Sequence, residues 1–169
     1  MSQEAGYAGK ILRVDLSSRS VNSVPTQDYA SRFLGGRGIA AKIYWDEVSP
    51  DISPFDPENR LLFFTGPLAG FPKVAASRWQ VCGKSPATDT EQFCYSNLGG
   101  HWGAQLKLAG YDGLVVQGKA DKPVYLSIQD DAIEIKNAVS IWGKNALQAQ
   151  ESLKAELGNS VKVVTTGPA

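Results

Sequence analysis

Apolar and polar residues alternate along residues 10–16 and again along residues 21–24. The turn-rich segment 17–20 separates the two runs, so the pattern predicts a β-hairpin with one solvated face. Residues 27–34 have helical spacing and end at paired glycines, and residues 39–48 have it again and end before a proline. We therefore expect two short helices after the hairpin.

A proline-rich loop over residues 50–59 precedes a continuous apolar run, residues 61–64, which is typical of a buried strand. The run leads into residues 66–72, where two glycines and two prolines predict an irregular loop. Such a loop can turn its backbone groups toward a ligand. A tight connection between two strands explains the same residues equally well.

The centre of the chain, residues 78–112, has the pattern of a segment that presents its backbone to a ligand. A strand-like run over residues 79–82 is followed by a polar loop and then by Gly99 and Gly100, which open an amphipathic helix expected over residues 99–109. Free amides at such a helix start favour an anion, most often phosphate. An ordinary glycine turn between a strand and a helix is the alternative.

The remaining residues complete an α+β pattern. Strands are expected at residues 114–117, 124–129, 132–136 and 161–165, with a helix at residues 145–157. The strands at 124–129 and 132–136 form a second hairpin. The predicted fold class is α+β, with mixed, mainly antiparallel sheets and a few helices. Hairpins recur beside a helix in both halves, as an internal duplication would produce.

Length and composition limit the class of protein. A chain of 169 residues with 43% hydrophobic content can bury one good core, which favours a single soluble domain. The formal net charge is zero, whereas a nucleic-acid-binding surface needs a basic excess. No run approaches the roughly 18 apolar residues of a membrane span, and the first residues do not form a leader pattern. We expect a cytoplasmic protein without nucleic acid or membrane as a partner.

Cys82 and Cys94 are the two cysteines of the chain, and His101 is its single histidine. A disulfide between the cysteines is not expected in a reducing cytosol. So few sulfur and imidazole donors cannot complete a typical four-ligand zinc or iron–sulfur site. Any metal must be carried by a cofactor or by residues outside this chain.

Two further patterns allow competing interpretations. Residues 36–41 satisfy G-x-G-x-x-A, but that dinucleotide fingerprint needs a buried strand before its first glycine, and the preceding residues have helical spacing instead. Arg78 follows the small residues 75–77, so its guanidinium can lie along the surface and meet a planar partner with several acceptors. A surface salt bridge is the alternative role for Arg78.

A series of short motifs runs through nearly the whole chain. The most specific is Asn97-Leu98-Gly99-Gly100-His101-Trp102-Gly103, and the others lie at residues 9–16, 34–38, 65–70, 77–79, 84–86, 106–112, 118–120, 142–144 and 167–169. In this order the motifs resemble the N-terminal domain of the aldehyde ferredoxin oxidoreductase family.

The resemblance implies a cofactor. Members of that family hold tungsten, or sometimes molybdenum, through the dithiolene sulfurs of two pterins, without a metal ligand from the protein. Residues 1–169 would be the N-terminal cofactor-binding domain, truncated at its C-terminal end, while later domains supply a [4Fe–4S] cluster and the groups nearest the substrate. The resemblance assigns Arg78 to a pterin, places Gly99, Gly100 and His101 in the cofactor-binding loop, and assigns the backbone carbonyl of Asn97 to a magnesium ion that bridges the pterin phosphates. It implies no catalytic residue in this chain.

The implied reaction is oxidation of a small aldehyde to its carboxylate, with two electrons passing through the cluster to ferredoxin. Another branch of the family reduces aromatic-ring thioesters, and Leu98 and His101 depart from the usual residues, which leaves the branch open. A different class of function is also possible: a stand-alone module that binds a phosphorylated small molecule or a partner subunit. The family motif that includes residues 167–169 normally extends further along the chain, which argues against it. Without its C-terminal domains the chain is expected to be inactive and to expose apolar area, which favours a homo-oligomer.

Overall fold

The computed structural model describes residues 5–87 and 89–168, and the chain divides into two compact units. The first unit is Met1–Lys119 and the second is Ala120–Ala169. Ala169, which ends the motif at residues 167–169, lies outside the described residues. The assignment of residues 1–169 to one cofactor-binding domain stays a prediction.

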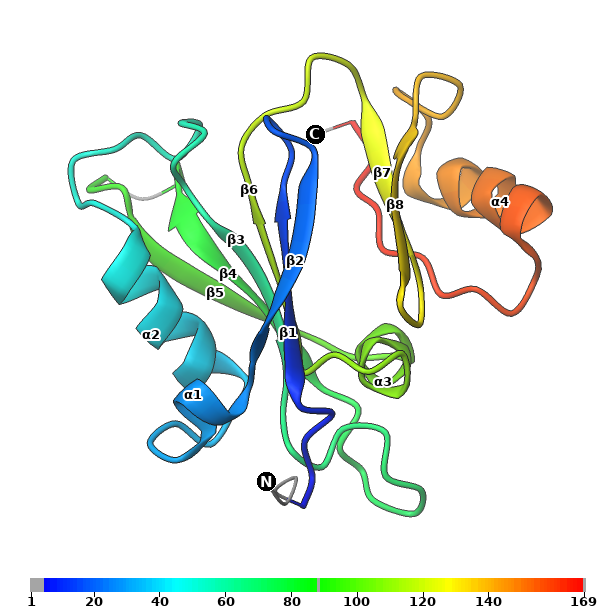
Figure 1. Cartoon of the computed structure of the whole chain (residues 1–169). Helices are drawn as coiled ribbons and strands as arrows, with labels where there is room; N and C mark the ends of the chain where they lie inside the picture. Colours follow the sequence, from blue (N-terminus) through cyan, green and yellow to red (C-terminus); the bar gives the residue numbers. More distant parts are fainter. Residues whose placement is uncertain (1–4, 88, 169) are drawn as a thin grey trace. The chain divides into compact units, whose positions relative to one another are not determined.

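A six-stranded mixed sheet forms the first unit, in the order β2-β1-β6-β3-β4-β5 (Figure 1). Its strands are β1 (Lys10–Asp15), β2 (Ser20–Pro25), β3 (Leu61–Thr65), β4 (Trp79–Ser85), β5 (Gln92–Leu98) and β6 (Gly113–Gln117), and its helices are α1 (Gln27–Ala30), α2 (Arg37–Glu47) and α3 (Trp102–Leu108). β1 and β6 pair in parallel, whereas every other neighbouring pair is antiparallel. The predicted α+β class with mainly antiparallel pairing is confirmed.

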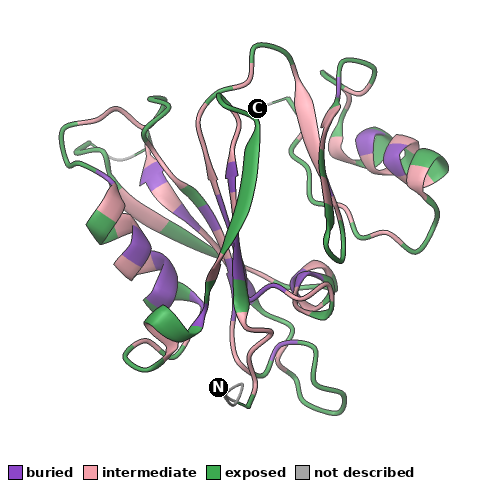
Figure 2. Cartoon of the chain, in the orientation of Figure 1, coloured by how far each residue is buried: buried purple, intermediate pink, exposed green. Residues whose placement is uncertain are grey.

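The core of this unit lies between α2 and one face of the sheet (Figure 2). Ile39, Ala40 and Ile43 are buried on one side of α2. They pack against buried strand residues, which are Ile11, Leu62, Phe64, Cys82 and Val115. Burying one such large apolar side chain stabilises the fold by about 1.5–3 kcal/mol. The apolar positions that predicted the helix and the strands therefore also join them.

The C-terminal end of α2 is fixed by charge. The carboxylate of Glu47 accepts hydrogen bonds from the guanidinium groups of Arg13, on β1, and Arg60, just before β3. Its side chain and both arginine side chains are largely buried. These ion pairs connect the end of α2 to β1 and to the segment before β3.

Three predicted elements of the first unit have different bounds. The polar loop expected after residue 82 is wrong, because β4 continues to Ser85 and residues 92–98 form β5. The first helix ends at Ala30, and residues 31–34 form turns and coil. The helix expected from residue 99 begins at Trp102, since Gly100 has a φ of 81°, which a right-handed helix does not admit.

The second unit contains β7 (Val124–Gln129), β8 (Ala132–Asn137) and α4 (Ala146–Leu157). The two strands form the expected antiparallel hairpin. The side chain of Asn145 accepts a hydrogen bond from the N–H of Gln148, whose side chain in turn accepts from the Asn145 N–H. This capping box starts α4, and Gly158, with a φ of 103°, ends it.

The final strand expected at residues 161–165 is wrong. These residues have no regular secondary structure, because β-branched residues form a strand only where another strand pairs with them. The hairpin-and-helix order does recur, but one unit has a six-stranded sheet and the other a two-stranded sheet. Among the described residues of both units, no helix is long and apolar enough to cross a membrane.

Candidate functional site

Two neighbouring strands bring predicted site residues together at one end of the sheet. The register places Trp79, the first residue of β4, opposite Leu98, the last residue of β5. Thr65, the last residue of β3, lies opposite Trp79 on the other side. Arg78 and Gly99 therefore lie next to each other just beyond the sheet, at the end where β1 begins in Figure 1.

The predicted cofactor-binding residues are all exposed at this end. Asn97 is part of β5 rather than of a loop, and it lies opposite Gln80 of β4. His101 is the N-cap residue of α3. Apart from their immediate chain neighbours, no described residue lies within 4 Å of a Cβ built on Gly99 or on Gly100. One open region of the surface thus contains Arg78, Asn97, Gly99, Gly100 and His101, and their ligands stay a prediction.

An aromatic cluster fixes the connection between β5 and α3. The ring centroids of Trp79 and Trp102 are 4.6 Å apart, and Phe63 lies 5.7 Å from Trp102. The indole Nε1 of Trp79 donates a hydrogen bond to the Gly99 carbonyl at 2.9 Å. Gly103 allows α3 to approach closely, since a Cβ there would lie 2.7 Å from the Cβ of Trp79. The buried ring of Trp79, packed against Phe63 and Trp102, therefore holds Gly99 in place.

The glycine- and proline-rich loop, residues 66–72, is supported on two sides. The Nζ of Lys107 donates hydrogen bonds to the carbonyl of Gly66 at 2.8 Å and of Pro67 at 3.2 Å. Pro67 also packs against Gly6 and Gly35, where a Cβ would come within 3.2 Å of it. The backbone of this loop is therefore fixed by the fold itself.

Asp112 links the segments that support this end of the sheet. Its buried carboxylate accepts hydrogen bonds from Ala8 N at 2.9 Å, Gly9 N at 2.8 Å and Thr26 Oγ1 at 2.7 Å. The Nζ of Lys107 lies 3.3 Å from the same carboxylate. Burial lowers the pKa of Lys107, and the charge of Asp112 opposes that shift. One ion pair thus joins α3, the start of β6 and the N-terminal segment.

The local charge at the site is positive although the chain is neutral. Residues 66–80 and 97–107 contain Lys73, Arg78 and Lys107 but no carboxylate, and among the described residues only the charge of Lys107 is offset, by Asp112. None of the ion pairs among the described residues includes Arg78, so these residues do not provide the salt bridge considered as its alternative role. An anionic group would meet a favourable field here.

The side chain of Gln80 suits a ligand that can donate a hydrogen bond. Its Oε1 is buried and has no hydrogen-bond partner within the described part of the chain. A buried amide oxygen left in that state costs about 1–3 kcal/mol, and an N–H from a ligand would remove this cost. A pterin ring edge carries such N–H groups, so the Gln80 amide would fit one. Sequence reasoning missed Gln80, although a polar residue between Trp79 and Val81 was a usable signal.

Two other site hypotheses are limited by the structure. The chain reaches Gly36 from turns and coil, not from a buried strand, so the context required by the dinucleotide fingerprint at residues 36–41 is missing. Instead, Gly36 is the N-cap of α2, and its N–H donates to the Thr65 carbonyl at 2.9 Å. Over residues 5–87 and 89–168, no group of three His, Cys, Asp or Glu side chains is placed to hold a metal ion.

The two cysteines should differ sharply in reactivity. Cys82 lies opposite Tyr95 and Cys94 opposite Gly83, so the free thiols are on opposite faces of the β4–β5 hairpin. Burial raises the pKa of Cys82 to about 11, whereas Cys94 is partly exposed. We expect a disulfide reagent at about pH 8 to modify Cys94 rapidly and Cys82 slowly, because little Cys82 thiolate exists at that pH. Cys94→Ser should abolish the rapid phase and Cys82→Ser should keep it, and two rapid thiols in the native chain would contradict this assignment.

Comparison with known proteins identifies relatives across the whole chain. Residues 11–169 match the model of the aldehyde ferredoxin oxidoreductase N-terminal domain. The chain is 42% identical over 166 residues to a tungsten-containing aldehyde ferredoxin oxidoreductase of Pyrococcus horikoshii, with 97% of the chain covered. It is 36% identical over 160 residues to the WOR-like subunit of an aliphatic sulfonate oxidoreductase of Pyrococcus furiosus, with 92% of the chain covered and 25% of that subunit.

A solved structure also shares the fold. The BamBC active-site complex of benzoyl coenzyme A reductase, solved with 1,5-dienoyl-CoA, matches with a TM-score of 0.86 and 40% identity. The match covers 90% of this chain and 23% of the other. The chain likewise spans 27% of the length of the Pyrococcus horikoshii relative, about a quarter.

Proposed function

Because the chain belongs to the aldehyde ferredoxin oxidoreductase family, we propose that it is the N-terminal domain of a tungsten or molybdenum bis-pterin oxidoreductase. The complete enzyme oxidises small aldehydes to carboxylates in the cytoplasm and passes the electrons to ferredoxin. One observation carries the proposal for this domain. The residues that the family motifs assign to the cofactor gather at one end of the sheet, where the adjoining segments contain no carboxylate.

The residues of this chain bind and orient the cofactor. Arg78 binds a pterin, because its guanidinium is exposed and its planar fork matches several acceptors at once. Gly99 and Gly100 would let phosphate oxygens approach the backbone, since among the described residues only their chain neighbours lie within 4 Å of a Cβ built there. Asn97 would offer its backbone carbonyl to a magnesium ion that accompanies the cofactor. It lies on the edge strand β5, where alternate carbonyls point away from β4.

The redox chemistry is supplied by the metal–pterin group when bound, and the protein contributes binding, orientation and electrostatics. The Trp79–Trp102 pair supports the Gly99 loop, because Trp79 packs on Trp102 and donates a hydrogen bond to the Gly99 carbonyl. A [4Fe–4S] cluster and the substrate pocket belong to the other domains of the polypeptide in this proposal.

Reduction of an aromatic-ring thioester is a second candidate function. The observation that favours it is the 40% identity to the benzoyl coenzyme A reductase complex, which is similar to the identity with the aldehyde oxidoreductases. The residues at this end of the sheet do not separate the two reactions, because they bind the shared cofactor and not the substrate.

The function can be tested on the complete reading frame. We expect cysteines spaced C-x-x-C-x-x-x-C downstream of residue 169, and a purified protein that contains tungsten and pterin. It should reduce ferredoxin with an aldehyde as the electron donor. A protein that reduces an aromatic thioester but does not oxidise aldehydes would support the second candidate. A complete protein purified under tungstate supply without metal or pterin would contradict both.

The isolated chain should behave differently. Residues 1–169 alone are expected to contain no stoichiometric tungsten, molybdenum or iron and to show no aldehyde oxidation, since half of the cofactor enclosure and the cluster ligands would be missing. Metal analysis of the purified fragment checks this directly. A value of about one tungsten per chain would show that the other domains are not needed to retain the cofactor.

A further inference from the structure

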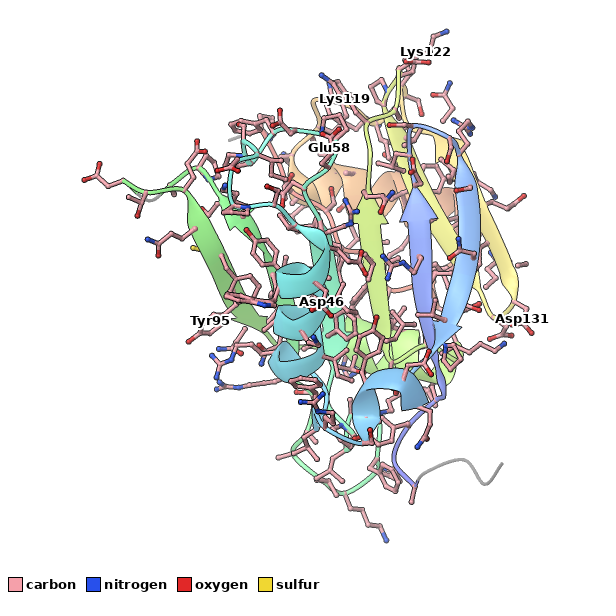
Figure 3. All side chains as sticks on the ribbon, turned by 60° about the vertical axis from the view of Figure 1, so that its left-hand side comes forward. Asp46, Glu58, Tyr95, Lys119, Lys122 and Asp131 are labelled. Carbon is pink, nitrogen blue, oxygen red and sulfur yellow. The ribbon has the colours of Figure 1, made fainter. Side chains whose placement is uncertain are left out.

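Arg37 reaches across the sheet toward the residues of the proposed site. It is the first residue of α2, whose N-cap Gly36 is hydrogen-bonded to Thr65 at the end of β3. The guanidinium carbon of Arg37 lies 4.1 Å from the ring centroid of Tyr95. Figure 3 shows Tyr95 on β5 beside α2. Arg37 therefore extends over β4 to the edge strand.

The strand register places Tyr95 on the same face as two site residues. Tyr95 lies opposite Cys82, and Asn97 lies opposite Gln80. Because side chains alternate along a strand, these four residues share one face, and Cys82 identifies it as the face covered by α2. Arg37, Gln80 and Asn97 thus belong to one face, next to the sheet end where Arg78 emerges.

Arg37 is not compensated by a carboxylate within the described residues. None of the ion pairs found there includes it, and the first turn of α2 has no acidic residue. Within the described part of the chain it contacts the ring of Tyr95 and, through its charge, influences the thiol of Cys82. An aromatic ring orients a guanidinium from one side and leaves its N–H edge available to acceptors. The Gln80 oxygen that lacks a partner lies on the same face.

We propose that Arg37 is a second cofactor-binding arginine, which binds a phosphate group of the pterin cofactor from the α2 side while Tyr95 holds its guanidinium in place. The proposal rests on the proposed function and adds a ligand contact to it. Arginine forms two parallel hydrogen bonds to a phosphate, which a single ammonium cannot reproduce. Arg37 and Arg78 would then bind the same cofactor from two directions.

The test compares variants of the complete enzyme by tungsten content, pterin content and the unfolding midpoint of the metal-free protein. Arg37→Ala should lower tungsten and pterin together by about tenfold or more when cofactor is limiting, as expected for a lost charged hydrogen bond. Arg37→Lys should retain only slightly more tungsten and pterin than Arg37→Ala. Lys42→Ala, which removes a charge from the outer side of the same helix, should keep the wild-type content.

Two variants of Tyr95 separate binding from a general loss of structure. Tyr95→Phe should retain the cofactor because the ring face, not the hydroxyl, contacts Arg37. Tyr95→Ala should lower the tungsten and pterin content, whereas the unfolding midpoint of the metal-free protein should fall much less. If the wild-type enzyme and the Arg37→Ala variant contain equal amounts of tungsten, the role of Arg37 is wrong but the proposed function stands. A wild-type enzyme without tungsten or pterin would overturn the proposed function as well.

Discussion

Replacing Asp112 with alanine is expected to lower the free energy of unfolding by about 3–5 kcal/mol, as when one member of a buried ion pair is removed. The N–H groups of Ala8 and Gly9 and the hydroxyl of Thr26 would lose their acceptor, and Lys107 would remain buried without its counter-charge. Because domains are stable by only about 5–15 kcal/mol, much of the variant should unfold under mild denaturant. Urea denaturation followed by far-UV circular dichroism measures the change.

Controls distinguish the ion pair from a general effect of lost charge. Asp121→Ala removes an exposed carboxylate and should change the unfolding free energy by less than about 0.5 kcal/mol. Adding Lys107→Met to Asp112→Ala should recover part of the loss, since the unpaired buried charge is then removed. An Asp112→Ala protein as stable as the Asp121→Ala protein would show that the buried network contributes nothing.

In the complete enzyme, Arg78→Ala is expected to weaken cofactor retention. A lost charged hydrogen bond costs roughly 1.5–3 kcal/mol, which corresponds to about 10- to 150-fold weaker binding. Arg78→Lys should restore only part of the loss, because an ammonium cannot reproduce the planar fork. Tungsten and pterin content per protein, together with turnover, measure the effect. Lys122→Ala, which removes an exposed charge from the second unit, provides the matched control. Full metal content and turnover in both Arg78 variants would make Arg78 an ordinary surface residue.

Much of the fold could be predicted because its signals are local. The alternation in β1 and the apolar run in β3 follow from the burial of one or both faces of each strand. β5 was missed because it is an edge strand with mostly exposed side chains, held by backbone hydrogen bonds to β4 that leave no apolar pattern. The insertion of β6 between β1 and β3 could not be read either, since pairing between distant segments is not encoded in local spacing.

In the candidate site too, residues within local motifs could be predicted, whereas contacts between distant segments could not. Family motifs identified Arg78, Asn97 and Gly99, and the register explains why they lie together. Asp112 was visible only as the last residue of a motif, because its hydrogen bond to Ala8 spans 104 positions. Arg37 belonged to a glycine pattern that pointed to a different ligand. Its contact with Tyr95 depends on how α2 crosses the sheet, which single-sequence patterns do not determine.

The hydrogen bond between Trp79 and Gly99 gives the site an intrinsic optical reporter. Trp79 is 2% exposed, whereas Trp45 and Trp142 are 84% and 73% exposed. A collisional quencher such as iodide therefore reaches the two exposed indoles first and leaves a shielded, blue-shifted emission. That emission comes from Trp79, whose ring is hydrogen-bonded to the loop that would meet the cofactor, together with the partly buried Trp102 4.6 Å away. Docking of a ligand at Gly99 can thus be followed by fluorescence without an attached dye.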